Sequence, residues 1–225
     1  MKIMAVIAAW NEKGNTKILA KRFLKVFKDN NIDGKVMFIL RGTKEDSGYN
    51  ELKAMKNKNI IPVYANDIHG LGPSHNFGFS LVPNDVDYIV TMDSDLNYQP
   101  EELPNMLKIN ADIVIGSRGM NRTGSWWRKA LSKLMNIILR KIWKLDIVDM
   151  TSNYRLYKTL VIKDIYPNVK ATGFEYCPEV LLVATRKGYI IKESPAEFTP
   201  RLSGESKMPI IKTTVGYFKL FMRYL

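Results

Sequence analysis

The sequence predicts an α/β fold in which a mostly parallel central sheet is flanked by helices. Apolar runs suited to buried strands recur along the chain, at 3–9, 35–40, 60–64, 86–92 and 111–116. Between these runs lie segments with helical spacing of apolar residues, for example 18–27. Strand–helix alternation of this kind favours parallel strands that are covered by helices on both faces. At 225 residues the chain is long enough for one substantial domain.

The second half of the chain is less regular. Its pattern predicts helices at about 125–144 and 175–187, and a late strand at 189–193. The glycine-containing segment 70–78 is expected just before a helix, whose N-terminus would be available to an anion. Helix capping explains these glycines almost as well, and their spacing does not fit a dinucleotide-binding fingerprint.

Ligands of such sheets bind outside the carboxyl ends of the strands, so the residues that follow each strand deserve inspection. The most informative of these segments is 93–95, where a β-branched and aromatic run stops at two aspartates. On an extended chain Asp93 and Asp95 point to the same side, and their repulsion calls for a hard divalent cation. Asn97 offers a third oxygen if the extended course continues. A solvated turn is the alternative for an isolated aspartate pair.

Charge and cysteine usage narrow the classes of function. The net charge of +12 attracts nucleic acid, anionic lipid headgroups or phosphorylated small molecules. Cys177 is the single cysteine, which excludes a disulfide framework or a cysteine-based zinc site and fits a reducing compartment. No uncharged apolar run approaches the roughly 18 residues that span a bilayer. The first ten residues read as a strand rather than a signal peptide, so we expect a soluble or peripheral protein.

Two segments combine apolar, aromatic and basic residues. Segment 126–144 places tryptophans and a broad apolar face beside a basic stripe, which is typical of an interfacial membrane helix or of a core helix with a solvated basic edge. Segment 209–225 repeats the combination, so we expect a main domain over 1–208 and a C-terminal amphipathic, membrane-associated helix over 209–225. Nucleic-acid binding is disfavoured because the strands are apolar and the basic residues favour helices and a late loop.

Taken together, these segments resemble the family 2 glycosyltransferases, and within them the dolichyl-phosphate mannose synthase branch of polyprenyl-phosphate glycosyltransferases. The similarity runs nearly end to end. Its motifs lie at residues 7–12, 70–78, 92–101, 115–118, 149–155 and 193–207. The most branch-specific of them is the late G-E-S-K at 204–207. The resemblance departs at Leu40-Arg41, where the family usually has an acidic pair near the nucleotide base, and at Asn153, where it has glycine.

The resemblance implies a GT-A-type nucleotide-sugar-binding domain that transfers a hexose with inversion to a polyprenyl (dolichyl) phosphate. Mannose from GDP-mannose is the favoured donor, with Mg²⁺ or Mn²⁺ as cofactor. The implied location is peripheral, on the cytoplasmic membrane face, with room for a membrane-anchoring protein partner. The alternative is a UDP-sugar-dependent relative that acts on a lipid phosphate or a saccharide hydroxyl. Transfer to a hydroxyl needs a carboxylate base, for which Glu175 and Glu179 are candidates.

The resemblance also implies roles for individual residues. The expected metal ligands are Asp93, Asp95 and Asn97. The residues expected to take part in catalysis, or to bind the diphosphate or the acceptor phosphate, are Asp95, Arg118, Arg201 and Lys207. The residues expected to bind the donor are Ala8, Trp10, Glu12, Asp67, Gly72, Asp93, Ser94 and Ser206. Because Leu40-Arg41 replaces the acidic pair, the resemblance does not determine the identity of the nucleotide base. Glu12 and Asp67 are candidates for recognising the base.

Overall fold

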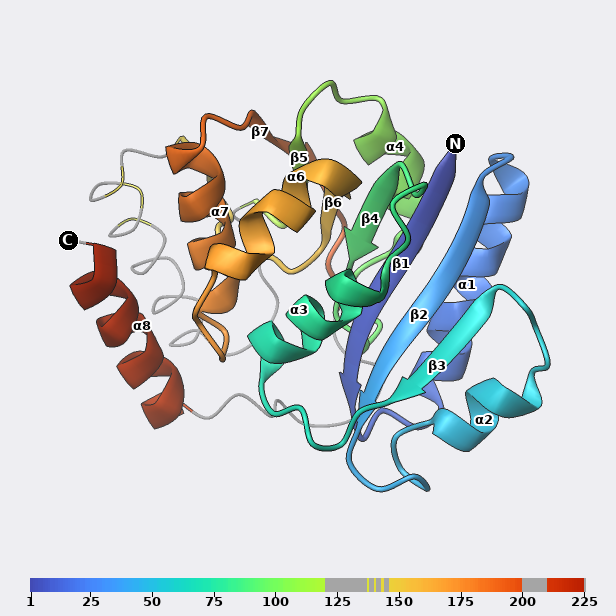
Figure 1. Ribbon diagram of the computed structural model, residues 1–225. Coiled ribbons are helices and arrows are strands. Elements are labelled where there is room, and N and C mark those ends of the chain that lie inside the picture. Colours follow the sequence, from blue (N-terminus) through green and yellow to red (C-terminus); the bar gives the residue numbers. More distant parts are fainter. Residues whose placement is uncertain (120–136, 138–139, 141–142, 144–145, 200–209, 225) are drawn as a thin grey trace.

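Within the described residues, seven strands form one sheet in the order β3-β2-β1-β4-β6-β5-β7 (Figure 1). This computed structural model describes residues 1–119, 137, 140, 143, 146–199 and 210–224. The strands are β1 (Lys2–Trp10), β2 (Asp33–Arg41), β3 (Ile60–Tyr64), β4 (Tyr88–Thr91), β5 (Ile113–Ser117), β6 (Arg155–Lys158) and β7 (Ile191–Pro195). All neighbouring pairs are parallel except those that β6 makes with β4 and β5. The predicted mostly parallel α/β sheet is thus confirmed.

Helices cover both faces of the sheet. They are α1 (Asn15–Asp29), α2 (Tyr49–Ala54), α3 (Leu71–Leu81), α4 (Leu103–Leu107), α6 (Thr159–Ile165), α7 (Tyr176–Arg186) and α8 (Ile210–Tyr224). Figure 1 shows α3, α6 and α7 in front of the sheet and α1 behind it. The expected helix at 175–187 is present as α7, whereas most of the expected helix at 125–144 lies outside the described residues.

Strand β1 divides the core into two halves, because its side chains alternate between the two faces. Ile3, Ala5 and Ile7 pack into the cluster on the side of α1, and Met4 and Val6 pack into the cluster on the side of α3, α6 and α7. A strand that is buried on both faces reads as a continuous apolar run, which is why the sequence reveals it.

Strand β6 and helix α6 have no counterpart among the elements predicted from the sequence. The strand has only four residues, Arg-Leu-Tyr-Lys, with a charged residue at each end. Its Arg155 is only 1% exposed, and its backbone pairs antiparallel with β4 and β5. A strand this short, with charged residues at both ends, cannot be recognised from periodicity. Periodicity is visible only when apolar residues repeat over several helical turns or several strand residues.

The order of the strands determines where a ligand would bind. From β1 the chain moves to β2 and β3 on one side, and it then crosses to β4 on the other side of β1. The strand order therefore reverses between β1 and β4, and in open α/β sheets ligands bind outside the carboxyl ends of the strands at this point. Trp10 ends β1, and the two aspartates follow β4. No helix among the described residues is both long enough and apolar enough to cross a membrane.

Candidate active site

Asp93, Asp95 and Asn97 lie in a turn rather than on an extended strand. Strand β4 ends at Thr91, and Leu96 has a left-handed backbone with φ 64°. The backbone N–H of Asn97 donates to Oδ1 of Asp95 at 3.2 Å, which stabilises the turn. The expectation of an extended course through Asn97 is therefore wrong, because the turn's own hydrogen bond overrides strand continuation. Both Asp95 and Asn97 are nevertheless buried within this turn, at 8% and 7% exposed.

The residues of this turn suit a divalent ion that is shared with a phosphorylated ligand. Oδ1 of Asn97 is buried and makes no hydrogen bond with any described residue. A buried amide oxygen without a partner is costly, and a cation would satisfy it. No group of three His, Cys, Asp or Glu that could hold a metal occurs among the described residues. One or two carboxylates plus substrate phosphates are the usual ligands of Mg²⁺, so this set fits such an ion.

Asn153 contacts the first aspartate from the other side. Its Nδ2 donates to Oδ1 of Asp93 at 3.0 Å, while its backbone carbonyl accepts the hydroxyl of Thr91 at 2.7 Å. The thiol of Cys177 lies 3.8 Å from Oδ1 of Asn153. Burial raises the pKa of Cys177 to about 11, so this thiol stays protonated near neutral pH. Asn153, which replaces a glycine of the resembled motif, thus orients Asp93.

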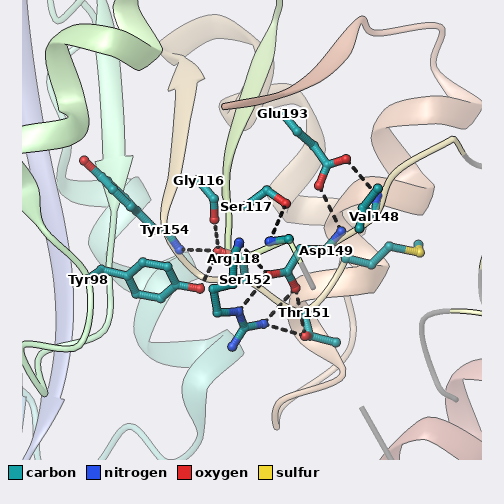
Figure 2. A network of polar contacts seen from close by, with 12 residues as sticks. Tyr98, Gly116, Ser117, Arg118, Val148, Asp149, Thr151, Ser152, Tyr154 and Glu193 are labelled. Atoms are coloured by element: carbon teal, nitrogen blue, oxygen red, sulfur yellow. Dashed lines mark hydrogen bonds and ion pairs between the residues drawn. The ribbon is translucent and has the colours of Figure 1, made fainter. Parts of the chain in front are cut away.

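Arg118 pairs with a buried carboxylate (Figure 2). Its Nε and Nη2 donate to the two oxygens of Asp149, each at 2.7 Å, and Nη2 also donates to the hydroxyl of Thr151 at 2.8 Å. The Asp149 side chain is fully buried, and the guanidinium lies over the rings of Tyr98 and Phe198. Arg118 therefore holds the segment after residue 148 in place, and phosphate binding by Arg118 stays a prediction.

Hydrogen bonds from several elements fix the rest of this segment. The carboxylate of Glu193 on β7 accepts the backbone N–H groups of Val148 and Asp149 at 2.8 and 2.9 Å. The hydroxyl of Ser152 accepts from Tyr98 at 2.8 Å and donates to the carbonyl of Gly116 at 2.7 Å (Figure 2). These contacts give Glu193 and Ser152 structural roles in shaping the site.

Buried Arg155 completes this network. It donates to the backbone carbonyls of Ser152, Cys177 and Met150 at 2.7–2.8 Å. Asp149, Asn153 and Arg155 lie within one motif of the sequence, but the sequence alone does not predict what each of them does. The available signal was the density of polar residues in 149–155, beside an otherwise apolar strand pattern.

A second polar corner lies at the ends of β1 and β2. The guanidinium of Arg41 lies 5.9 Å from the ring centre of Trp10, whose side chain is 47% exposed. Nη1 of Arg41 donates to the carbonyl of Gly70 at 2.9 Å and to the hydroxyl of Ser74 at 3.3 Å. Burial lowers the pKa of Arg41. Glu12 accepts a hydrogen bond from Asn15, and Asp67 lies exposed in the loop after β3.

The remaining donor-binding candidates have different surroundings. Ala8 is partly buried within β1, and Ser94 is 7% exposed between the two aspartates. Gly72 lies inside α3, so the expectation that the helix begins after segment 70–78 is wrong. A side chain at Gly72 would lie 2.2 Å from the carbonyl oxygen of Ala171, and its own N–H donates to Thr172. Close packing thus explains this glycine, and its N–H already has a partner within the protein.

The two candidate carboxylate bases both accept hydrogen bonds from backbone N–H groups. Glu179 is fully buried and accepts from the N–H groups of Lys170 and Ala171 and from the side chains of Arg223 and Tyr224. Glu175 accepts from the N–H groups at residues 172 and 173. Arg201, Ser206 and Lys207 lie outside the described residues, so the structure does not place them.

Comparison with known proteins places these features in a family. The family model described as glycosyl transferase family 2 matches residues 4–166. An undecaprenyl-phosphate mannosyltransferase of Micrococcus luteus is 26% identical over 217 residues, which cover 92% of this chain and 88% of that protein.

Solved structures with a similar fold include crystal structures of glucosyl-3-phosphoglycerate synthase from Mycobacterium tuberculosis. The complex of that enzyme with Mn²⁺, UDP and glucosyl-3-phosphoglycerate matches with a TM-score of 0.70 at 14% identity, over 98% of this chain and 77% of that chain. Its complex with Mg²⁺ and UDP matches with a TM-score of 0.66 at 15% identity, over 94% and 74% of the two chains. At this level of identity the likeness establishes the fold.

Proposed function

The chain belongs to glycosyl transferase family 2, and we propose that it transfers mannose from GDP-mannose to a polyprenyl phosphate with inversion at the anomeric carbon. The observation that carries the proposal is the oxygen-rich turn at 93–97, which follows β4 at the point where the strand order reverses. The match over nearly the whole chain to an undecaprenyl-phosphate mannosyltransferase supports the sugar and the lipid phosphate.

Asp93, Asp95 and Asn97 would hold the divalent ion, Mg²⁺ or Mn²⁺. When bound, such an ion neutralises the charge that develops on the diphosphate leaving group. The residues around it act by orientation: Asn153 fixes one oxygen of Asp93, and the Asn97 backbone fixes one oxygen of Asp95. The Mn²⁺ and Mg²⁺ complexes of the M. tuberculosis enzyme support use of a divalent ion by this fold.

The acceptor needs little help from an acid–base residue. A phosphate oxygen is already ionised at neutral pH, so it can attack the anomeric carbon while the bond from that carbon to the diphosphate oxygen breaks. Transfer to a saccharide hydroxyl would require a positioned base. Glu179 already accepts four hydrogen bonds, and Glu175 accepts two from backbone N–H groups. Their use in the fold favours the phosphate acceptor. Arg201, Ser206 and Lys207 stay proposed phosphate and donor ligands on the strength of their motif.

A lipid acceptor also suits the outer surface of α8. Val215, Phe218 and Met222 are 47%, 63% and 67% exposed and follow a spacing of three and four residues, so they form one apolar stripe, which is called here the outer stripe of α8. Lys219 is exposed beside it. We propose peripheral attachment through this stripe to the cytoplasmic membrane face, with or without a membrane-anchoring protein partner.

The proposal is tested with an Asp95→Ala variant. Transfer of labelled mannose from GDP-mannose to a polyprenyl phosphate is measured with Mn²⁺ and with EDTA, and we expect a loss of roughly 100-fold or more. Asp146→Ala, at a fully exposed aspartate, is the matched control and keeps the wild-type rate. An Asp95→Ala enzyme that stays active and metal-stimulated would refute the site. Folding is checked by circular dichroism, and donors are compared by calorimetry against UDP-glucose and UDP-N-acetylglucosamine.

A further inference from the structure

Arg41, at the carboxyl end of β2, has one edge of its guanidinium without a hydrogen bond to any described residue. Both of its hydrogen bonds leave from Nη1, to Gly70 and Ser74. Its Nε and Nη2 make no hydrogen bond with a described residue, and no carboxylate among those residues forms an ion pair with it. The Nε–Nη2 edge is the side of a guanidinium that binds two neighbouring acceptors at once. Neither nitrogen is among the buried side-chain atoms that lack a partner in the described residues, so this edge is open to solvent and to a ligand.

The backbone around Arg41 is held rigidly. Gly42 has φ 97°, and a side chain there would lie 1.6 Å from Oδ1 of Asn11, so only glycine fits. The carbonyl of Gly42 accepts the hydroxyl of Tyr64 at 2.6 Å, and its N–H donates to Oδ1 of Asn66 at 2.9 Å. Contacts within the protein therefore hold this corner in place.

Its position suits the base of a nucleotide rather than its phosphates. Arg41 ends β2, and the aspartates follow β4, which lies two strands away across β1. Neighbouring strands are about 4.8 Å apart, so the two ends are separated by roughly 10 Å. A diphosphate at the aspartates would leave the ribose over the end of β1, and the base beside Trp10 and Arg41. An exposed aromatic ring at this point is a stacking surface for a base.

We propose that Arg41 selects the donor nucleotide by donating from Nε and Nη2 to two adjacent acceptors on the base. The inference rests on the proposed function and specifies its donor. Guanine presents O6 and N7 as such a pair, and bidentate arginine contact with them is a common way to read this base. Adenine presents an amino donor beside N7, and in uracil an N–H separates the two carbonyl oxygens. Cytosine, with N3 and O2, has a comparable pair and serves as a comparison.

Nucleotide analogues test the contact without changing the protein. We expect 7-deaza-GDP, which lacks the N7 acceptor, to bind the wild-type enzyme roughly 10-fold or more weakly than GDP in calorimetry with Mn²⁺. Inosine diphosphate keeps O6 and N7 and lacks only the amino group, so it should bind within about 3-fold of GDP. The reverse pattern would mean that carboxylates such as Glu12 or Asp67 read the other edge of guanine, and it would overturn the inference.

Variants then assign the effect to the residue. Arg41→Lys keeps the positive charge but removes the paired Nε and Nη2 donors, and Arg41→Gln removes both the charge and the donor pair. The control, Lys35→Gln, removes a charge from an exposed residue near the opposite end of the same strand. We expect both Arg41 variants to lose roughly 10-fold to 100-fold in GDP affinity and much less in UDP affinity, while Lys35→Gln keeps the wild-type ratio. In Arg41→Lys, the difference between GDP and 7-deaza-GDP should vanish.

The outcomes separate this inference from the proposed function. If the wild-type enzyme prefers GDP but the analogue and the Arg41 variants leave that preference intact, the role of Arg41 is refuted and the GDP-mannose donor stands. If the wild-type enzyme prefers UDP or CDP, guanine selection is refuted. Transfer from the corresponding nucleotide sugar to the polyprenyl phosphate would then show whether the rest of the proposed function survives. An equal loss for all bases in Arg41→Lys would also refute selection.

Discussion

His75 is a buried histidine that the fold keeps neutral. Its Nδ1 lies 3.0 Å from the carbonyl of Leu71 and must donate to it, while its Nε2 makes no hydrogen bond among the described residues. The ring stacks on Tyr176 with centres 5.8 Å apart. Burial lowers the pKa of His75 from 6.5 to about 4, because the charged ring would lose its hydration.

This histidine predicts a loss of stability in mild acid. Between pH 6.5 and 4 His75 is protonated in the unfolded chain but stays neutral in the folded chain. The contribution of this residue to the free energy of unfolding is therefore complete above pH 6.5 and falls toward pH 4. The expected loss from this residue is about 3 kcal/mol. Urea unfolding at pH 7 and pH 4.5 should show a smaller drop for His75→Gln than for the wild type. Equal drops would contradict the assignment.

Removal of Arg118 from its pair with Asp149 should lower the free energy of unfolding substantially. Arg118→Met keeps the apolar stem against Tyr98 and Phe198 but removes the guanidinium that pairs with the fully buried carboxylate of Asp149. Removal of one partner of a buried pair typically costs about 3–5 kcal/mol. The exposed pair of Arg140 and Asp146 is the control, and Arg140→Met should cost less than about 1 kcal/mol. Denaturant unfolding measures both, and similar small changes would show that Arg118 is not structural.

At the scale of elements, α8 is attached to α7 by polar and aromatic contacts. Its Arg223 and Tyr224 bind the buried Glu179 of α7 at 2.6 and 2.9 Å. Leu220 is 1% exposed, and Tyr217 and Phe221 pack against the core cluster on the side of α3, α6 and α7. Glu179 also accepts the backbone N–H groups of residues 170 and 171, next to the loop that packs on Gly72. The inner face of α8 thus belongs to the core, which leaves the outer stripe for another partner.

The outer stripe of α8 predicts the strength of membrane binding. Phe218→Glu should weaken binding to vesicles that contain phosphatidylglycerol by roughly 10-fold or more, because burial of such a side chain contributes about 1.5–3 kcal/mol. Leu160→Glu makes the same change at a side chain of α6 that is 76% exposed, and it should bind like the wild type. Vesicle sedimentation measures the partition. Equal losses in both variants would point to net charge alone, and no loss in either would exclude the stripe.

At the scale of the whole molecule, the charge of +12 adds a long-range attraction to anionic surfaces. Each basic residue near an anionic bilayer contributes about 1 kcal/mol, and salt screens this contribution. Wild-type binding to anionic vesicles should therefore weaken by roughly 10-fold or more between 50 mM and 500 mM salt, and binding to neutral vesicles should change little. Binding that does not depend on salt would mean that apolar contacts alone attach the protein.

The sequence by itself determined the parallel strands, the position of the aspartate pair and the family. Strands buried on both faces leave continuous apolar runs, so β1 to β5 could be found from local pattern alone. The carboxyl end of each predicted strand then indicated where Asp93, Asp95 and Arg118 would lie. Metal binding, the nucleotide and the membrane surface stay predictions, since they concern groups outside the chain.

Only the tertiary structure decided how these residues are used. Arg118 meets Asp149 across 31 positions of sequence, and Arg41 meets Gly70 across 29. The insertion of β6 between β4 and β5 brings Asn153 to Asp93. No local pattern contains these contacts, because side-chain pairing between distant segments is set by strand order and packing. The physical reason is that periodicity reports which face is buried, whereas the partner on that face depends on the rest of the fold.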